Sequence, residues 1–170
     1  MDDAGIAGRL RRGLLLLAGL GLAGTALDLG AARHWQSAIQ LVPWACLAVA
    51  ATGIILVAVR PTGPRIRLAR LLMIVVAACA VLGVYEHVAA NYAAAPLDFR
   101  FATRWEGMSS LQRWWAAATQ AVGPSPPVAP AVLAWTALCG YLATLGLPVS
   151  AGSAPSLPAG RGERAATRAR

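Results

Sequence analysis

Charged residues are scarce in this chain. Aspartate, glutamate, arginine and lysine together make up 13% of its 170 residues, whereas hydrophobic residues make up 58%. A soluble domain of this length typically carries about 25% charged residues, roughly twice as many. The apolar residues also form long continuous blocks, without the spacing of an amphipathic helix or a half-buried strand. The composition therefore excludes an ordinary soluble domain and predicts an integral membrane protein.

Lysine is absent altogether. All 15 basic residues are arginines, and the net charge is +8. The lack of lysine, together with the abundance of alanine and glycine, is typical of a GC-rich bacterial genome. A nucleic-acid-binding protein would gather its basic residues on one face or stripe, but here the arginines flank the apolar blocks. The charge pattern indicates membrane topology, with the lipid bilayer as a partner, and we expect no nucleic-acid partner.

Paired cysteines are also lacking. Cys46, Cys79 and Cys139 each lie inside an apolar block, where cysteine behaves as a small hydrophobe, and no two of them form a CxxC pair. This argues against a disulfide framework, a zinc ribbon and a thiol oxidoreductase. The sequence contains no phosphate-binding glycine loop, nucleophile elbow or metalloprotease motif. We therefore expect no enzyme.

Four apolar blocks predict four membrane spans, at about residues 12–31, 37–59, 71–92 and 128–149. A bilayer core of about 30 Å needs ~20 apolar residues in a helix. The predicted fold class is an all-α membrane protein, with residues 1–150 forming a bundle of four transmembrane helices. We expect the long connection of residues 93–127 on the outer side. Residues 151–170 have almost nothing to bury and are predicted to form a disordered cytoplasmic tail.

The placement of the arginines predicts the orientation of the spans. Three arginines precede the first span, four lie between the second and third spans and four lie in the tail, against four in the other two loops. The positive-inside rule then places both termini in the cytoplasm of a multi-pass protein of the bacterial inner membrane. A signal peptide is the alternative, because Arg11 and Arg12 precede LLLLAGLGLAGTA and GAA follows at 30–32. The glycine at −3 and the polar Asp28 and Arg33 argue against cleavage there.

Small residues are frequent in the spans. Gly21, Gly83 and Gly140 belong to three different predicted helices. Such residues let helix backbones approach closely in lipid, which favours a compact bundle. The same glycines and alanines could also follow from GC-rich coding alone.

The long connection begins with LDFRF, in which Leu97, Phe99 and Phe101 alternate with Asp98 and Arg100. This alternation predicts a short extended, strand-like piece. The following stretch, RWEGMSSLQRWWAAATQAV, predicts a short amphipathic outer helix. One of its faces carries Trp105, Met108, Gln112, Trp115 and Thr119. A helix rich in tryptophan at the edge of a span is expected to lie in the outer headgroup layer; the alternative is a cap folded over the mouth of the bundle.

A polar cluster is predicted near the outer ends of the spans, made up of Asp28, His34, Glu86 and His87. Counted from Arg12 and Arg70, the two carboxylates both lie about 24 Å along their helices, in the outer quarter of the bilayer core. Mixed carboxylate and imidazole ligands suit a divalent transition metal. A proton-exchange site is equally compatible with these residues.

A structural role for the same residues is the competing interpretation. In that case they hydrogen-bond one another, or pair with Arg33, Arg100 or Arg104, and clamp the outer loop onto the bundle. His87 and Asn91 are four residues apart and share a helical face. The sequence leaves the choice between a clamp and a ligand site open.

Several stretches resemble a family of small uncharacterised four-span bacterial membrane proteins. They are DLGAARHWQSAIQLVPW, then RLLMIVVAACAVLGVYEHVAANY and LDFRF, followed by the proline-rich entry to the last span. The positions that carry the resemblance are His34, Trp35, Pro43, Gly83, Val84, Tyr85, His87 and Asn91. It covers most of residues 10–148 and implies four spans with a polar outer edge. It implies no activity.

These observations predict a non-enzymatic membrane protein that works through partners as an accessory subunit, with a protein partner or a second copy of itself. No cofactor is expected in that case. The alternative is a small metal- or proton-handling permease, which would use Asp28, His34, Glu86 and His87 as its site.

Overall fold

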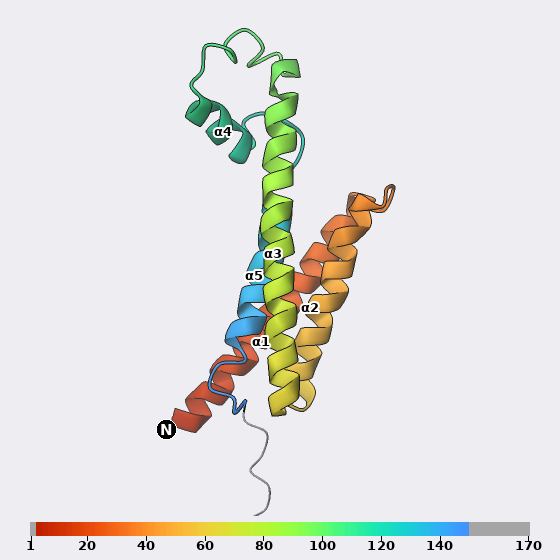
Figure 1. Ribbon diagram of the computed structural model, residues 1–170, viewed down its shortest axis with the longest axis vertical. Coiled ribbons are helices and arrows are strands. Elements are labelled where there is room, and N and C mark those ends of the chain that lie inside the picture. The colour runs from red at the N-terminus through yellow and green to blue at the C-terminus, as the bar shows by residue number, and fades with distance from the viewer. Residues whose placement is uncertain (1–2, 150–170) are drawn as a thin grey trace, which may run out of the picture.

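The fold is entirely helical within residues 3–149, the part of the chain that the computed structural model describes. This range contains α1 (Asp3–Ala31), η1 (Ile39–Leu41), α2 (Val42–Val59), α3 (Gly63–Ala94), η2 (Ala95–Leu97), α4 (Ser110–Ala118) and α5 (Val128–Leu142), as Figure 1 shows. The predicted all-α class is confirmed. The predicted disordered tail, residues 151–170, lies outside the described residues.

Three helical segments are long and apolar enough to cross a membrane: Gly5–Ala31, Ile39–Val59 and Gly63–Leu97. They indicate a membrane-embedded protein. The fourth predicted span differs from its expected bounds, because α5 has 15 residues, a length of about 22 Å. The chain continues in turns after Leu142, with backbone hydrogen bonds up to Leu147.

Proline and local capping explain where the long helices begin and end. Pro43 and Pro64 lie in the first turns of α2 and α3, where a missing N–H costs little. As a result α3 begins at Gly63, about two turns before the predicted span. The end of α1 has two backbone bonds typical of a Schellman motif, from Arg33 N to Gly30 O and from His34 N to Leu29 O. Arg33 takes the positive φ, 50°, that this motif requires.

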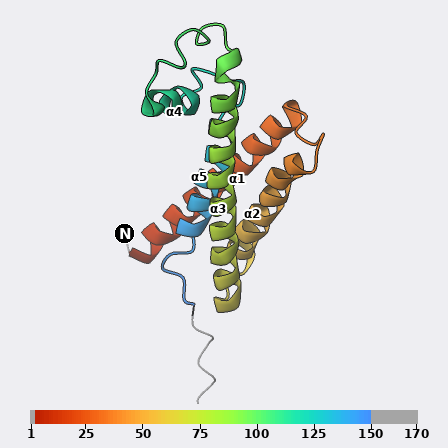
Figure 2. The same cartoon turned by 45° about the horizontal axis from the view of Figure 1, so that its top comes forward.

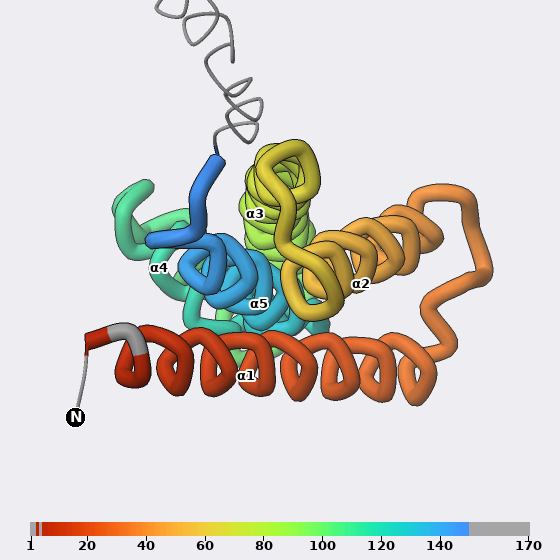
Figure 3. The backbone as a smooth tube through the Cα atoms, turned by 90° about the horizontal axis from the view of Figure 1, so that it is seen from below, coloured from red at the N-terminus to blue at the C-terminus, as the bar shows by residue number. Residues whose placement is uncertain are grey.

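Helix α5 lies at the centre of the bundle. It packs against both α1 and α3, while α2 packs against α3 and more lightly against α1 and α5. Figure 3 shows this arrangement from below, with α5 between α1 and α3. The two helices α1 and α2 form a hairpin whose connection points away from the far end of α3 and from α4, in both Figure 1 and Figure 2.

Glycines mark the closest helix contacts, as the sequence suggested. Gly21 of α1 lies directly against Thr136 of α5, and a Cβ at Gly83 would lie 3.1 Å from the Cβ of Pro130. Met73 of α3, only 1% exposed, joins α2 and α5 by packing against one glycine on each helix. In three pairs of helices, therefore, a side chain of one helix packs directly against a glycine of the other.

The two ends of the molecule differ in charge. At one end, here called the basic end, lie the start of α1, the α2–α3 connection and the end of α5 (Figure 1). The start of α1, the α2–α3 connection and the first turns of α3 carry seven arginines: Arg9, Arg11, Arg12, Arg60, Arg65, Arg67 and Arg70. The opposite end holds the cap, defined as residues 98–127, which is attached to the far end of α3. We call it the cap end.

The cap differs from its predicted secondary structure. No strand forms within residues 3–149, and the predicted extended piece, LDFRF, consists of the end of η2 followed by turns. The amphipathic helix is also shorter than expected, because α4 begins only at Ser110. A capping box fixes that start: the Ser109 side chain accepts from Gln112 N, and Gln112 Oε1 accepts from Ser109 N at 2.9 Å.

Candidate functional site at the cap end

The anchor of the cap is Asn91, near the end of α3. Its side chain is completely buried. The amide nitrogen donates to Ala117 O at 3.2 Å and to Ser125 O at 2.7 Å, and the amide oxygen accepts from Ser125 N at 2.8 Å. Both N–H groups and the oxygen therefore have partners, so the cost of burying the amide is offset. One side chain joins α3 to the end of α4 and to the loop before α5.

Gly123 lets the cap chain pass directly over this amide. Its φ is +79°, and a Cβ there would lie 2.5 Å from the Asn91 Cα and 2.8 Å from the Asn91 Cβ. No side chain fits in that space, and glycine is the residue that takes this φ without strain. The position thus needs glycine for both its backbone conformation and its packing.

His87, one turn below Asn91, makes a second contact with the same loop. Its Nδ1 lies 2.8 Å from Pro126 O. Because a carbonyl oxygen only accepts, this contact requires a proton on Nδ1. Two residues on one face of α3 therefore hold residues 123–126, which agrees with the clamp interpretation for His87.

Aromatic side chains fill the space between α3 and α4. The ring centroid of Trp114 lies 4.7 Å from that of Tyr92 and 6.4 Å from that of Tyr85. Trp105 meets Tyr92 edge-on, with 5.3 Å between the ring centroids. Trp105 is 5% exposed and belongs to a small apolar core with Phe101, Ala117 and other cap residues. The cap therefore has a core of its own, beside that of the helix bundle.

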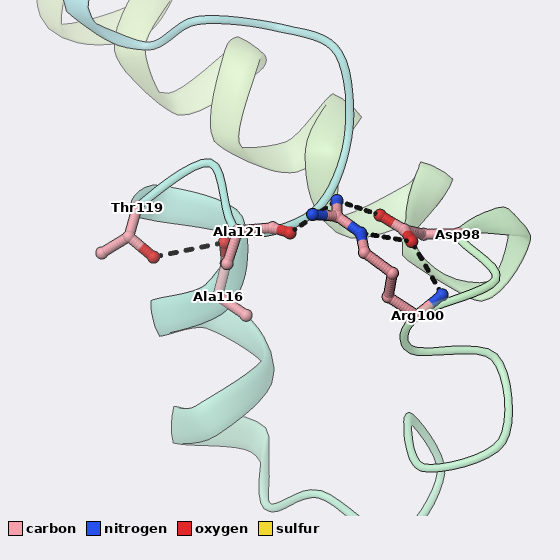
Figure 4. Close-up of polar contacts among 5 residues, drawn as sticks. All are labelled: Asp98, Arg100, Ala116, Thr119 and Ala121. Atoms are coloured by element: carbon pink, nitrogen blue, oxygen red, sulfur yellow. Dashed lines mark hydrogen bonds and ion pairs between the residues drawn. The ribbon is translucent and has the colours of Figure 1, made fainter.

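Asp98 and Arg100 brace the start of the cap, as Figure 4 shows. Arg100 Nη2 is 2.6 Å from Asp98 Oδ2 and donates to Ala121 O at 3.0 Å, and Arg100 N donates to Asp98 Oδ1 at 3.0 Å. The hydrogen bonds from the side chain and the backbone of Arg100 lower the pKa of Asp98 below its ordinary value. Because Arg100 also donates to Ala121 O, the Asp98–Arg100 pair links the start of the cap to the segment that follows α4.

Two open hollows lie on the cap. The first, called the tip hollow, has a volume of about 530 Å³ and is lined by Ala94, Leu97, Asp98, Phe99, Arg100, Gly123 and Pro124. The second, called the α4 hollow, has a volume of about 440 Å³ and is lined by Phe101, Arg104, Met108, Gln112, Trp115, Ala116, Thr119 and Ala121. The face predicted for the amphipathic helix mostly lines the α4 hollow, except that Trp105 points into the cap core.

The four residues predicted as a metal site do not come together. Asp28 and Glu86 are exposed on α1 and α3, and His34 lies in the α1–α2 connection, where its backbone oxygen accepts from Trp44 Nε1 at 2.8 Å. His87 faces the cap. Within residues 3–149 no group of three or more histidine, cysteine, aspartate or glutamate side chains could hold a metal ion. The proposed ligand set is therefore not assembled in this structure.

The arginine pairing expected for the cluster differs as well. In the part of the chain that the structure describes, the recorded ion pair joins Arg100 to Asp98, a residue that was not assigned to the cluster. Arg104 instead lies over the Phe101 ring, 4.0 Å from its centroid. The residues that sequence reasoning missed are Asn91, as the main anchor, and Gly123. The shared face of His87 and Asn91 was a signal for the first of them.

Comparison of this chain with protein-family models, with curated proteins and with solved structures finds no match. The resemblance of residues 10–148 to small four-span bacterial membrane proteins therefore rests on its short motifs alone.

Proposed function

We infer that this protein is a non-enzymatic membrane subunit that presents its cap to a partner protein. The observation that carries this proposal is the exposure of the tip hollow. Leu97 and Phe99 are each 88% exposed, although the cap beneath them is fixed to α3 by the buried Asn91 amide. Large apolar side chains held rigidly in an exposed position mark interaction sites.

The distance of the tip hollow from the basic end supports a partner in water over one in lipid. Leu97 lies about 40 Å along the α3 direction from Arg70, at ~1.5 Å per residue. A hydrocarbon core of about 30 Å that begins near Arg70 ends well before Leu97. The tip hollow then projects beyond the lipid headgroups into water. Covering its apolar side chains with a partner protein is favourable there, because it removes apolar surface from water.

The finer topology belongs to the same proposal: four spans with both termini in the cytoplasm of a bacterial cell. Its support is the gathering of seven arginines at the basic end and the path of α5, which returns from the cap to that end. Fusions at the C-terminus test it. We expect a fluorescent protein to fluoresce there and an exported phosphatase to be inactive; the reverse result would contradict this orientation.

Photocrosslinking in native membranes tests the partner. A photoreactive residue replaces Phe99 in the tip hollow, and the matched control replaces Glu106, which is also exposed in the cap but does not line that hollow. We expect a discrete adduct from position 99 and none from position 106. An adduct of twice the 17.6 kDa chain mass identifies the partner as a second copy.

Two results would overturn the proposal. One is the absence of a discrete adduct from positions 97 and 99, and the other is the same adduct pattern from position 106. A second variant, Phe99→Asp, is expected to abolish the adduct formed from position 97. Because Phe99 is exposed, this change leaves the fold intact.

A further inference from the structure

The α4 hollow is lined by exposed hydrogen-bond donors that no other group in the described part of the chain accepts from. In the described part of the chain the guanidinium of Arg104, the amide nitrogen of Gln112 and the indole nitrogen of Trp115 make no recorded hydrogen bond. The Gln112 oxygen is already used by Ser109 N. The hollow therefore presents solvent-exposed N–H groups beside a positive charge, and an external acceptor can reach them.

The charge of the lining favours an anion. Arg104 is held in place by the Phe101 ring, and none of the residues that line the hollow is acidic. Asp98 interacts electrostatically with Arg104 but makes its ion pair with Arg100. Planar guanidinium groups bind phosphate oxygens through paired hydrogen bonds. A phosphate-bearing group matches both the charge and the donors.

The position of α4 indicates where that group comes from. Trp114 of α4 stacks beside Tyr85 and Tyr92 of α3. These tyrosines lie about 22 and 33 Å along α3 from Arg70, which brackets the far edge of a hydrocarbon core of about 30 Å. Tryptophan and tyrosine gather at such edges. The α4 hollow thus lies at headgroup depth, lower than the tip hollow.

We propose that the α4 hollow binds the headgroup of an anionic phospholipid from the leaflet at the cap end. Arg104 contacts the phosphate, and Gln112 and Trp115 donate to the headgroup oxygens. The exposed side chains of Leu111 and Trp115, 79% and 69% exposed, meet the acyl chains of the same leaflet. The site is independent of the tip hollow and of any protein partner.

Lipid titration of the full-length, detergent-purified protein tests the site, with native mass spectrometry as the readout. Phosphatidylglycerol is compared with phosphatidylcholine, which has the same phosphodiester but no net charge. Arg104→Gln is compared with Arg33→Gln, which removes an arginine from the other loop at the same end. We expect phosphatidylglycerol binding to weaken roughly tenfold in Arg104→Gln, the loss of one charge-assisted contact, and to be unchanged in Arg33→Gln.

A second pair of variants distinguishes loss of the headgroup site from a general loss of apolar contact with lipid. Trp115→Ala removes a wall of the hollow, whereas Leu111→Ala removes another exposed apolar side chain on α4 that does not line it. We expect only Trp115→Ala to lower the preference for phosphatidylglycerol over phosphatidylcholine. Equal binding of the two lipids by the wild type, or equal loss in Arg104→Gln and Arg33→Gln, would overturn the proposal. Competition by free glycerol phosphate would also overturn it, because the ligand would then be soluble.

Discussion

The two ends of the bundle hold a distant segment against the long helices in different ways. At the basic end, Arg70 donates to Thr144 Oγ1 at 2.9 Å and to Thr144 O at 3.1 Å, and Arg11 donates to Ala143 O at 3.1 Å. At the cap end, the neutral amide of Asn91 makes three hydrogen bonds, and the His87 ring adds one to Pro126 O. The donors at the basic end, Arg11 and Arg70, are charged, whereas the main donor at the cap end, Asn91, is uncharged and fully buried.

The chemistry of the acceptors explains this difference. Ala143 and Thr144 follow the C-terminus of α5, where carbonyl groups without helical partners carry a partial negative charge that favours a cation. Arg11 and Arg70 are half-buried, so their charges can still reach headgroups or water. Asn91 is sealed inside the cap, where an unpaired charge would be costly. The comparison predicts that the cap end depends on exact hydrogen bonding and the basic end on charge.

The largest effect is expected from Asn91→Leu, which keeps the number and branching of the side-chain heavy atoms and removes all three hydrogen bonds. Ser125 N and two carbonyl groups then lose their partner, at about 1–3 kcal/mol for each group left buried without one, or about 4 kcal/mol in total. We expect rapid trypsin cleavage at Arg113 in the cap, monitored by mass spectrometry. Glu86→Gln, an exposed change on the same helix, is the control. A wild-type cleavage rate in Asn91→Leu would refute the role of Asn91 as the anchor.

Gly123→Ala tests the same end through the backbone. We expect a loss of about 3 kcal/mol, the sum of strain from φ +79° and overpacking against the Asn91 backbone. Gly146→Ala is a matched control, since Gly146 has φ +73° but nothing within 4 Å of an added Cβ. Thermal unfolding in detergent gives the loss of stability for each variant. The difference between the two losses measures the packing contribution alone. Equal losses would mean that the close approach to Asn91 contributes nothing.

Arg70→Gln probes the basic end, with a smaller expected loss of about 2 kcal/mol because Arg11 still caps α5. Arg67→Gln serves as control, since Arg67 is exposed on the same helix and makes no recorded contact among the described residues. Thermal unfolding at low and high salt sharpens the comparison. The loss from Arg70→Gln should shrink in high salt, whereas the loss from Asn91→Leu should not, because buried neutral hydrogen bonds are not screened.

Most of the helical architecture could be predicted from the sequence, because long apolar blocks and flanking arginines act locally. The ends of the helices were less predictable. Pro64 allowed α3 to begin at Gly63, well before the last arginine, and the turns after η2 replaced the strand suggested by alternating Leu97, Phe99 and Phe101. Alternation predicts a strand only where a neighbouring strand can pair with it, and none is present in residues 3–149.

The candidate site was harder to predict, since it depends on contacts between distant segments. Equal depth along two helices suggested that Asp28 and Glu86 would meet, but depth does not fix the direction in which a helix tilts or which face it presents. The α1–α2 hairpin leans away from the far end of α3 (Figures 1 and 2), and within residues 3–149 the two acids are not part of any group of three or more potential metal ligands. The role of Asn91 required the loop of residues 123–126, which lies 32 or more positions along the chain.

His87→Ala removes the second contact of the cap end and should cost about 1 kcal/mol, the net value of one hydrogen bond at a half-buried site. His87→Asn is the matched variant, because its amide nitrogen replaces Nδ1 and can still donate to Pro126 O. We expect trypsin cleavage at Arg113 to rise modestly in the first variant and to return toward the wild-type rate in the second. No difference between them would assign the effect to ring packing.

The smallest effect concerns the one ion pair recorded in the described range, and it tests whether charge matters at the cap end at all. The pKa of Asp98 is lowered from its ordinary value of about 3.8 by hydrogen bonds from Arg100. A carboxylate with a lowered pKa stabilises the folded state above that ordinary value, and the contribution is lost as the pH falls below it.

Trypsin does not work at such acidity, so pepsin cleavage of the cap between pH 5 and pH 2 is the measurement. We expect the wild type to lose protection as the pH falls and Asp98→Asn to show less of this change. Glu106→Gln removes a cap acid that has no recorded ion pair among the described residues, and it should keep the wild-type profile. A flat profile in the wild type would mean that Asn91, His87 and the aromatic core attach the cap without help from the ion pair.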